Sequence, residues 1–363
     1  MFCSSSKLLK TFIGHTSTIW TIDYSTFNDS QYICSGSQDC TVRVWDIDNN
    51  KQIKLFNGHS NAVTCVKFVS YYRHYHKVNN CLPIVCSSAC DSTIRFWDFE
   101  TTGQFQVLNG HTNWIFGIAF SSFNNGRYLC SASKDSTIRL WDVETFKSLH
   151  AFSGHTNAIW CVEFSPLQNS NDNKDKRNGV GVIGGNGYTI CSGSWDNTIR
   201  LWDIETTKEL TIFKGHEGCV RSIKYSQYET NIICSGSEDK SVRLWDIRSK
   251  QEIHVFRGHT NNVYTIEYLP FVSNDNKESD GTSMVNANII CSGSNDNTIR
   301  FWDIRTNKQL HLIKGNDNGD SGIISLKCAQ LKNKEKKNKS NDDSPCSVNL
   351  CYGSLNGPIR IWG

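Results

Sequence analysis

Short runs of alternating apolar and variable residues recur along the chain, each bounded by turn-forming residues. The segment IWCVEF (159–164) shows the period of two that is typical of a half-buried β-strand. The runs TICSGS (189–194), TIRLWD (198–203) and ELTIFK (209–214) follow it. The pattern predicts four short strands in this unit, and we name them a, b, c and d in order.

The unit repeats along the chain in a fixed register. Trp-Asp pairs begin at Trp45, Trp97, Trp141, Trp202, Trp245 and Trp302, and a seventh Trp stands at Trp362. Gly-His pairs end at His15, His59, His111, His155, His216 and His259, with Asn316 at the seventh place. Each Trp of a pair precedes the next His or Asn316 by 14 residues, whereas 29 to 47 residues lead from there to the next Trp. Half of the unit is therefore constant in length and the other half accepts insertions.

This register, with the segment ICSGSWDNTIRLWD (190–203) as its clearest copy, resembles the WD-repeat (WD40) family over essentially the whole chain. The resemblance implies an all-β propeller. A four-stranded unit cannot bury both of its faces alone, so neighbouring units must stack in a ring. Residues Lys7–Phe12 form a strand d with no partners before it, and the last unit stops after strand c. We therefore expect the N-terminal strand to complete the seventh blade and close the ring.

We predict one domain over residues 1–363, a seven-bladed propeller of four antiparallel strands per blade. Strand d of blade seven is expected at about 7–13, and the blades at about 14–57, 58–109, 110–153, 154–214, 215–257, 258–314 and 315–363.

The resemblance also implies a structural hydrogen-bonded tetrad of His, Ser, Asp and Trp in most blades. The expected sets are His15, Ser37, Asp39, Trp45; His111, Ser133, Asp135, Trp141; His155, Ser194, Asp196, Trp202; His216, Ser237, Asp239, Trp245; and His259, Ser294, Asp296, Trp302. Recurrence in five blades argues against a catalytic triad. Blade two has Ala89 in place of the serine, and blade seven has Asn316 and Asn356 in place of His and Asp. We therefore expect blade seven to be the loosest.

The long insertions all lie between strands a and b, at about Val69–Leu82, Leu167–Tyr188, Phe271–Asn288 and Ala329–Val348. Turns of an antiparallel meander alternate between two rims. The a–b and c–d turns share one rim, which we call the bottom, and the d–a and b–c turns share the top rim. The lysine-rich run 332–339 is interpreted as a solvated loop rather than a nuclear localisation signal.

A zinc site in blade two, suggested by His74, His76, Cys81, Cys86 and Cys90, is rejected from strand geometry. About 13 Å of strand separates Cys86 from Cys90, so ligands in the bottom loop and Cys90 at the top could not share one ion.

The informative positions are those that vary while the framework is constant. In the family, side chains at the start of strand a and just before the b–c turn surround the top mouth of the channel and contact peptides. The resemblance therefore implies a partner-binding site, and its residues here are Trp20, Trp114, Phe116, Lys134, Trp160, Trp195, Arg221 and Tyr264. All four Trp residues outside the seven repeat positions fall in this set. We expect the mouth to bind a protein segment that presents an apolar or basic side chain.

Two alternatives remain open. The segments WDIR at 245–248 and 302–305 match the WDxR box of substrate receptors of cullin-type ubiquitin ligases, in which Arg248 and Arg305 would contact the ligase adaptor. A G-protein β-like signalling scaffold shares the seven blades, but no coiled-coil helix precedes the first strand in this sequence.

Composition narrows the class of protein. Lys and Arg number 38 against 35 Asp and Glu, a net charge of +3 that predicts no obligatory nucleic acid or membrane partner. The 16 Cys residues with no secretory signal indicate reduced thiols and a cytoplasmic location, with the nucleus as a second location. The sequence contains no phosphate loop, carboxylate pair or nucleophile motif. We expect a non-catalytic scaffold with protein or peptide partners and with no cofactor, metal or small-molecule substrate.

Overall fold

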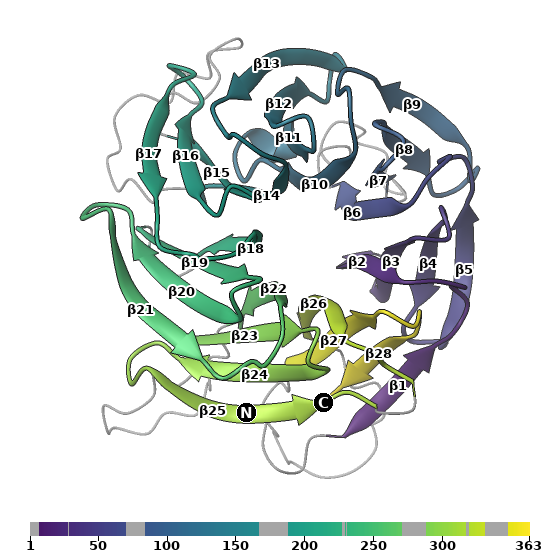
Figure 1. Cartoon of the computed structure of the whole chain (residues 1–363). Coiled ribbons are helices and arrows are strands. Elements are labelled where there is room, and N and C mark those ends of the chain that lie inside the picture. Colours follow the sequence, from purple (N-terminus) through teal and green to yellow (C-terminus); the bar gives the residue numbers. More distant parts are fainter. Residues whose placement is uncertain are drawn as a thin grey trace, which may run out of the picture.

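Seven antiparallel sheets of four strands stand in a ring around a central channel (Figure 1). The computed structural model describes residues 7–27, 29–69, 84–166, 188–226, 229, 231–270, 288–316, 319–330 and 348–363. The predicted all-β, seven-bladed propeller is confirmed. The described part contains one helical turn, the 3-10 turn η1 (Asn124–Gly126).

Each blade runs from an inner strand a at the channel to an outer strand d. The inner strands are β2 (Ile19–Phe27), β6 (Val63–Val69), β10 (Ile115–Phe120), β14 (Ile159–Phe164), β18 (Val220–Tyr225), β22 (Val263–Tyr268) and β26 (Ile323–Gln330). The b strands are β3 (Ser30–Ser37), β7 (Ile84–Ala89), β11 (Tyr128–Ser133), β15 (Thr189–Ser194), β19 (Ile232–Ser237), β23 (Ile289–Ser294) and β27 (Val348–Ser354). The c strands are β4 (Val42–Asp46), β8 (Ile94–Asp98), β12 (Thr137–Asp142), β16 (Ile199–Asp203), β20 (Ser241–Asp246), β24 (Thr298–Asp303) and β28 (Ile359–Trp362). The d strands are β5 (Lys51–Phe56), β9 (Gln104–Leu108), β13 (Lys147–Ser153), β17 (Glu209–Phe213), β21 (Gln251–Arg257), β25 (Lys308–Lys314) and, for blade seven, β1 (Leu8–Phe12).

The ring closes as the repeat register predicts. Strand β1 pairs antiparallel with β28, and the sheet order of blade seven is β1-β28-β27-β26 (Figure 1). Beyond the strands, the backbone amides of Lys7 and Gly363 each donate to the carbonyl of the other, at 3.0 and 3.2 Å. The first and last segments of the sequence therefore share one sheet, which covers the edge that β28 would otherwise expose.

Apolar side chains between adjacent blades form the core. One cluster joins Val42 and Phe56 of blade one to Val63 and Val85 of blade two. Their contact is close: a Cβ on Gly36 would lie 2.6 Å from Cγ1 of Val63, so this position has no room for a side chain. The repeated strand-b cysteines, including Cys34, are buried in these interfaces, and the cysteines of the described part are free thiols.

The serine of the structural tetrad is a different residue from the one expected. In blade one the indole Nε1 of Trp45 donates to Oγ of Ser35 at 2.8 Å, and that oxygen lies 2.8 Å from Nε2 of His15. Ser37 instead accepts from the backbone amide of Asp39 and donates to the carbonyl of Ser17. The two serines lie on the same face of β3, but Ser35 is two residues nearer along the strand to the residue that pairs with Trp45.

The correction applies to six blades, whose tetrad serines are Ser35, Ser87, Ser131, Ser192, Ser235 and Ser292. The expected residues Ser37, Ser133, Ser194, Ser237 and Ser294 each receive the backbone amide of the turn aspartate instead. Blade two is therefore complete: Ser87 joins His59 and Trp97 at 2.8 and 2.7 Å, and Ala89 removes nothing from its tetrad.

The charge state of the tetrad follows from its hydrogen bonds. Nδ1 of His15 donates to Asp39 at 2.8 Å, so Nε2 is the acceptor for the hydroxyl of Ser35. Burial lowers the pKa of His15 and outweighs the raising effect of Asp39. Burial alone would raise the pKa of Asp39, but hydrogen bonds from His15 and Thr41 hold it well below its usual range. A neutral imidazole and an ionised carboxylate therefore link the d–a turn to the b–c turn.

Blade seven replaces the tetrad with another polar network. Asp320, which is 3% exposed, accepts hydrogen bonds from the hydroxyl of Tyr352 at 2.8 Å and from Nε of Arg360 at 3.0 Å. Tyr352 occupies the strand position of the tetrad serine, and the backbone amide of Asn316 also donates to Asp320. The blade that lacks the His and Asp of the repeat thus has its own buried carboxylate.

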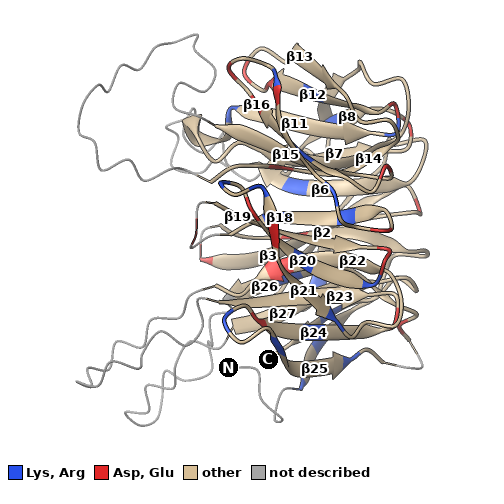
Figure 2. Ribbon diagram, turned by 60° about the vertical axis from the view of Figure 1, so that its left-hand side comes forward, with Lys and Arg blue, Asp and Glu red and all other residues tan. Residues whose placement is uncertain are grey.

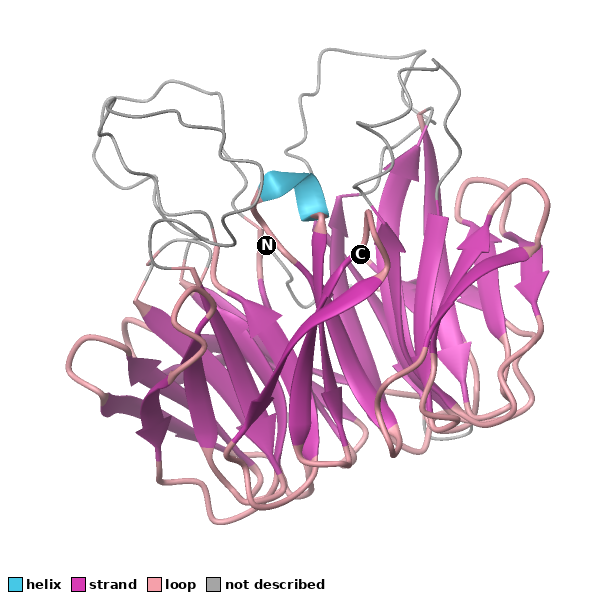
Figure 3. Ribbon diagram, turned by 90° about the horizontal axis from the view of Figure 1, so that it is seen from above, coloured by secondary structure: helices cyan, strands magenta, loops and turns pink. Residues whose placement is uncertain are grey.

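The strands that flank the four insertions end at one rim, as the strand order requires (Figure 3). Apart from a few end residues, the insertions lie outside the described residues, as do the lysine-rich run 332–339, His74, His76 and Cys81. Basic and acidic residues are interspersed over the blades in Figure 2. None of the described residues belongs to a helix with the length and apolarity that crossing a membrane requires.

Candidate functional site

One backbone irregularity, repeated in every blade, directs side chains into the channel. The pairing of strands a and b shifts register between the first and third residues of strand a in all seven blades. The residue between them is outside the ladder, and a β-bulge re-aims such a side chain. These residues are Trp20, Thr64, Phe116, Trp160, Arg221, Tyr264 and Ile324, and all seven line one cavity.

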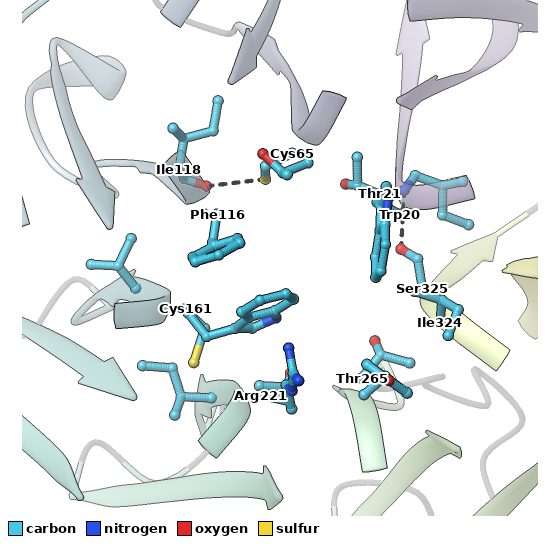
Figure 4. A pocket seen from close by; sticks show the side chains of 18 of the residues that line it. Trp20, Thr21, Cys65, Phe116, Ile118, Cys161, Arg221, Thr265, Ile324 and Ser325 are labelled. Carbon is cyan, nitrogen blue, oxygen red and sulfur yellow. Dashed lines mark hydrogen bonds between the residues drawn. The ribbon is translucent and has the colours of Figure 1, made fainter. Parts of the chain in front are cut away.

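The cavity lies in the channel, with a volume of about 520 Å³. Figure 4 shows Trp20, Phe116 and Arg221 pointing into it from different blades. Trp114 and Trp195, which come from the other two positions singled out in the sequence, also line it. All seven blades therefore contribute side chains from the expected set or its repeat equivalents.

Aromatic rings from blades three and four form a continuous stack. The rings of Phe116 and Trp160 are stacked at a centroid distance of 4.1 Å, and Trp195 is stacked on Trp160 at 6.0 Å. Trp114 contacts Phe116 edge-on at 6.2 Å, and Trp20 reaches Trp160 edge-on at 6.4 Å from blade one. Offset and edge-on contacts are the favourable geometries of aromatic pairs. The rings thus form one rigid apolar wall, called below the aromatic wall.

Arg221 covers one end of the aromatic wall. Its guanidinium carbon lies 3.9 Å from the ring centroid of Trp160 and 5.4 Å from that of Tyr264. Nε and Nη2 both donate to Oε1 of Glu238, the Nε bond at 2.8 Å. Glu238 precedes the turn aspartate of blade five, so an ion pair across one blade holds the arginine on the indole.

Lys134 covers the other end of the wall, but does not line the cavity. Its Nζ lies 4.2 Å from the ring centroid of Trp114, and Trp114 is 40% exposed whereas Phe116 is 7% exposed. The indole Nε1 of Trp195 is buried and has no hydrogen-bond partner among the residues that the structure describes. The wall therefore offers an exposed ring, a shielded ring and a buried donor.

Charged residues below the aromatic wall form a chain of ion pairs that sequence reasoning missed. Lys327 contacts Glu267 at 2.6 Å and Asp23 at 3.9 Å, and Lys224 contacts Glu163 at 2.9 Å. The signal was available, because Asp23, Lys67, Glu163, Lys224 and Glu267 each stand eight residues after the GH histidine and alternate in sign. In blade three this position holds Ala119, which interrupts the series of alternating charges.

The charges of this chain stabilise one another. Burial would lower the pKa of Lys327, but the carboxylates of Glu267 and Asp23 outweigh it and raise the pKa. Burial likewise would raise the pKa of Glu267, and Lys224 and Lys327 hold it below its usual range. The cavity therefore has an aromatic mouth and an ionised, internally neutralised floor.

The residues of the possible ligase-adaptor contact lie elsewhere. Arg248 and Arg305 are exposed in the c–d turns of blades five and six, where their backbone amides donate to Asp246 and Asp303 at 2.9 Å. These turns stand at the opposite end of the strands from the aromatic mouth.

The reactive groups around the cavity have structural partners or a raised pKa. Its histidines and turn aspartates are used in the tetrads, and Cys90 at the mouth is a thiol whose pKa burial raises to about 11. Within the described ranges, no group of three or more His, Cys, Asp or Glu side chains is arranged to hold a metal ion.

Comparison with known proteins gives a family match. The model of the family described as "WD domain, G-beta repeat" matches residues 6–46, 50–98, 103–142, 146–203, 207–246 and 250–303. The chain is 31% identical to the nuclear distribution protein PAC1 of Fusarium vanettenii over 110 residues, which is 30% of this chain and 24% of that protein. It is 28% identical to mitogen-activated protein kinase kinase kinase A of Dictyostelium discoideum over 31% of this chain and 11% of that protein. Villidin of the same organism is 30% identical over 31% of this chain and 7% of its own length. The chain thus matches about a quarter or less of each of these relatives.

Proposed function

Because the chain belongs to the WD40 repeat family, we propose that it is a non-catalytic interaction scaffold that binds a peptide segment of a protein partner at the aromatic top mouth. We further propose a cytoplasmic location, with the nucleus as a second location. The family consists generally of non-catalytic scaffolds, and the nuclear distribution proteins among the relatives fit that role.

The aromatic wall is the observation that carries this proposal. Trp20, Trp114, Trp160 and Trp195 are the four tryptophans that the repeat does not require, and all four line one cavity. Large aromatic side chains are concentrated at the centres of protein interfaces, where they contribute most of the binding energy. A wall made from several blades and opening to solvent is therefore suited to hold an apolar side chain.

The size of the cavity suits a side chain rather than a folded domain. At about 520 Å³ it falls in the range of ligand pockets, roughly 300–1,000 Å³. Its ionised floor pairs its own charges, so a ligand group gains little by displacing them. We propose that the partner inserts one side chain against the aromatic wall while its backbone lies on the top rim.

The ubiquitin-ligase receptor remains the alternative function, since Arg248 and Arg305 are exposed in neighbouring blades on the opposite rim. The two functions are compatible in one molecule. Binding of the purified propeller to the ligase adaptor, lost in an Arg248→Ala/Arg305→Ala variant, is the outcome this alternative requires.

The test is a double variant, Trp160→Ala/Trp195→Ala, in the full chain. Affinity purification followed by mass spectrometry should show loss of the partners that the wild type retains. Leu310→Ala is the matched control, because Leu310 is an exposed apolar residue on the outer strand β25. A double variant with the circular dichroism of the wild type and all of its partners would contradict the proposal.

A further inference from the structure

We infer that the segment bound at the mouth carries a carboxylate beside an apolar residue, and that the mouth disfavours basic segments. This inference rests on the proposed function, since it specifies the partner of the same site. It departs from the expectation of a basic side chain drawn from the sequence.

Cations of the protein itself already occupy faces of the aromatic wall. The guanidinium carbon of Arg221 lies 3.9 Å from the centroid of Trp160 and 5.5 Å from that of Trp195. Nζ of Lys134 lies 4.2 Å from the centroid of Trp114. A cation within about 6 Å of a ring centroid already makes the attractive contact that an incoming cation would seek. A basic side chain would therefore meet two fixed positive charges.

Most charged side chains at the mouth and floor of the cavity have a counter-ion within the protein. The floor pairs its own lysines and acids, and Glu238 is the counter-ion of Arg221. Within the described part Lys134 makes no ion pair, and its Nζ lies over the ring of Trp114 instead. Of the two cations that lie on the aromatic wall, Lys134 is thus the one without a counter-ion in the described part, and a carboxylate of the partner would supply it.

Arg221 has N–H donors that its ion pair with Glu238 does not use. Its Nε and Nη2 converge on a single oxygen of Glu238, while Nη1 makes no hydrogen bond with a described residue. A guanidinium has five N–H donors in a planar fork, so it can accept a second carboxylate without losing the first. Acidic groups of the partner can therefore be bound at either end of the aromatic wall.

The aromatic rings between the two cations favour an apolar residue beside the carboxylate of the partner. A continuous series of ring contacts, through Trp114, Phe116 and Trp160, leads from one cation to the other. Trp114 is 40% exposed, an unusual exposure for such a large apolar side chain. An apolar residue next to the carboxylate would cover this ring while the carboxylate reaches Lys134.

The experiment is an array of synthetic octapeptides in which one position, flanked by Leu or Phe, is Glu, Gln, Lys or phosphoserine. The labelled full-length protein should bind the Glu peptides about two- to fivefold more tightly than their Gln counterparts, and more tightly than the Lys peptides. Lys134→Glu should reverse this preference. Lys308→Glu, the same charge change on the outer strand β25, should leave it unchanged.

A second measurement on the wild type is independent of the folding of the variants. Raising NaCl from about 50 to about 500 mM should weaken binding of the Glu peptides and leave the Gln peptides nearly unaffected, because salt screens an exposed ion pair. Preference for Lys peptides, a preference for phosphoserine over Glu, or salt-independent binding of the Glu peptides would overturn the inference and leave the mouth as a binding site. Binding no stronger than that of Trp160→Ala/Trp195→Ala for every peptide would overturn both this inference and the proposed function.

Discussion

The carboxylate of Asp320 lies 3.0 Å from Nε of Arg360, at the place where the other six blades join an imidazole to an aspartate. Both side chains are almost fully buried, and the hydroxyl of Tyr352 completes the arrangement. This network is the counterpart of the tetrad in the blade that also closes the ring.

Asp320→Asn should destabilise blade seven. Loss of one partner from a buried ion pair costs about 3 kcal/mol or more, because the remaining charge has no counter-ion. Hydrogen exchange measured by mass spectrometry should accelerate in β26, β27, β28 and β1. Asp39→Asn, the control, should accelerate exchange in blade one. The expectation that blade seven of the wild type exchanges fastest stays a prediction, and the same experiment tests it.

Ser87→Ala should cost about 2 kcal/mol in the free energy of unfolding. The substitution leaves Nε1 of Trp97 and Nε2 of His59 buried without a partner. Ser37→Ala should cost less than about 1 kcal/mol, because the equivalent place in blade two already holds Ala89. Urea unfolding at neutral pH measures both. Equal losses in the two variants would assign the tetrad to the wrong serine.

Acidification should lower the melting temperature in two stages. The pKa of His15, His59, His155 and His216 is lowered by burial from the ordinary value of 6.5, so the unfolded chain takes up these protons first. Their contribution is complete above pH 6.5 and is lost as the pH falls below it. The tetrad aspartates have a lowered pKa as well, and their contribution is lost below their ordinary value of 3.8. Scanning calorimetry from neutral to acid pH measures this; a melting temperature that rises on mild acidification would contradict it.

Arg221 and Glu238 should show a small, salt-sensitive coupling. A double-mutant cycle with Arg221→Ala and Glu238→Ala should give less than about 1 kcal/mol, because both side chains are partly exposed at the mouth. The coupling should fall in high salt. The single variant Arg221→Ala should also change the fluorescence of Trp160, since its ring loses the cation above it, whereas Lys308→Ala should not. A coupling that is unchanged in high salt would contradict a pair that is partly accessible to solvent.

The repeat register predicted most of the architecture, because the positions of Trp and His are set by the strand period. The same register identified Trp20, Phe116, Trp160 and Arg221 as side chains of the channel mouth. The physical reason, a bulge at the second residue of each inner strand, became visible only in the pairing of β-strands.

Other features were beyond the reach of the sequence pattern. Ser35 and Ser37 lie on one face of β3, so a period of two could not distinguish them. Asp320 does not stand at the sequence position of the repeat histidine, which is Asn316 in blade seven. It takes the structural role of that histidine because the folded chain brings it to Arg360. The cation–π contact between Arg221 and Trp160 joins residues of neighbouring blades, and no local sequence pattern specifies such a contact.

The pairing of Leu8 with Trp362 also determines when strand β1 can find its partner during synthesis of the chain on the ribosome. Among the strands of the described part, β1 is synthesised first, yet its neighbour β28 is synthesised last. Until then β1 has no sheet to join, and the nascent chain carries an unpaired strand edge that can join foreign strands. Its closing contact joins residues that are far apart in sequence, Leu8 and Trp362, and contacts of large sequence separation form slowly. Lys7, which directly precedes β1, and Lys10 within the strand are charges of the kind that protect such edges from aggregation while the rest of the ring is made.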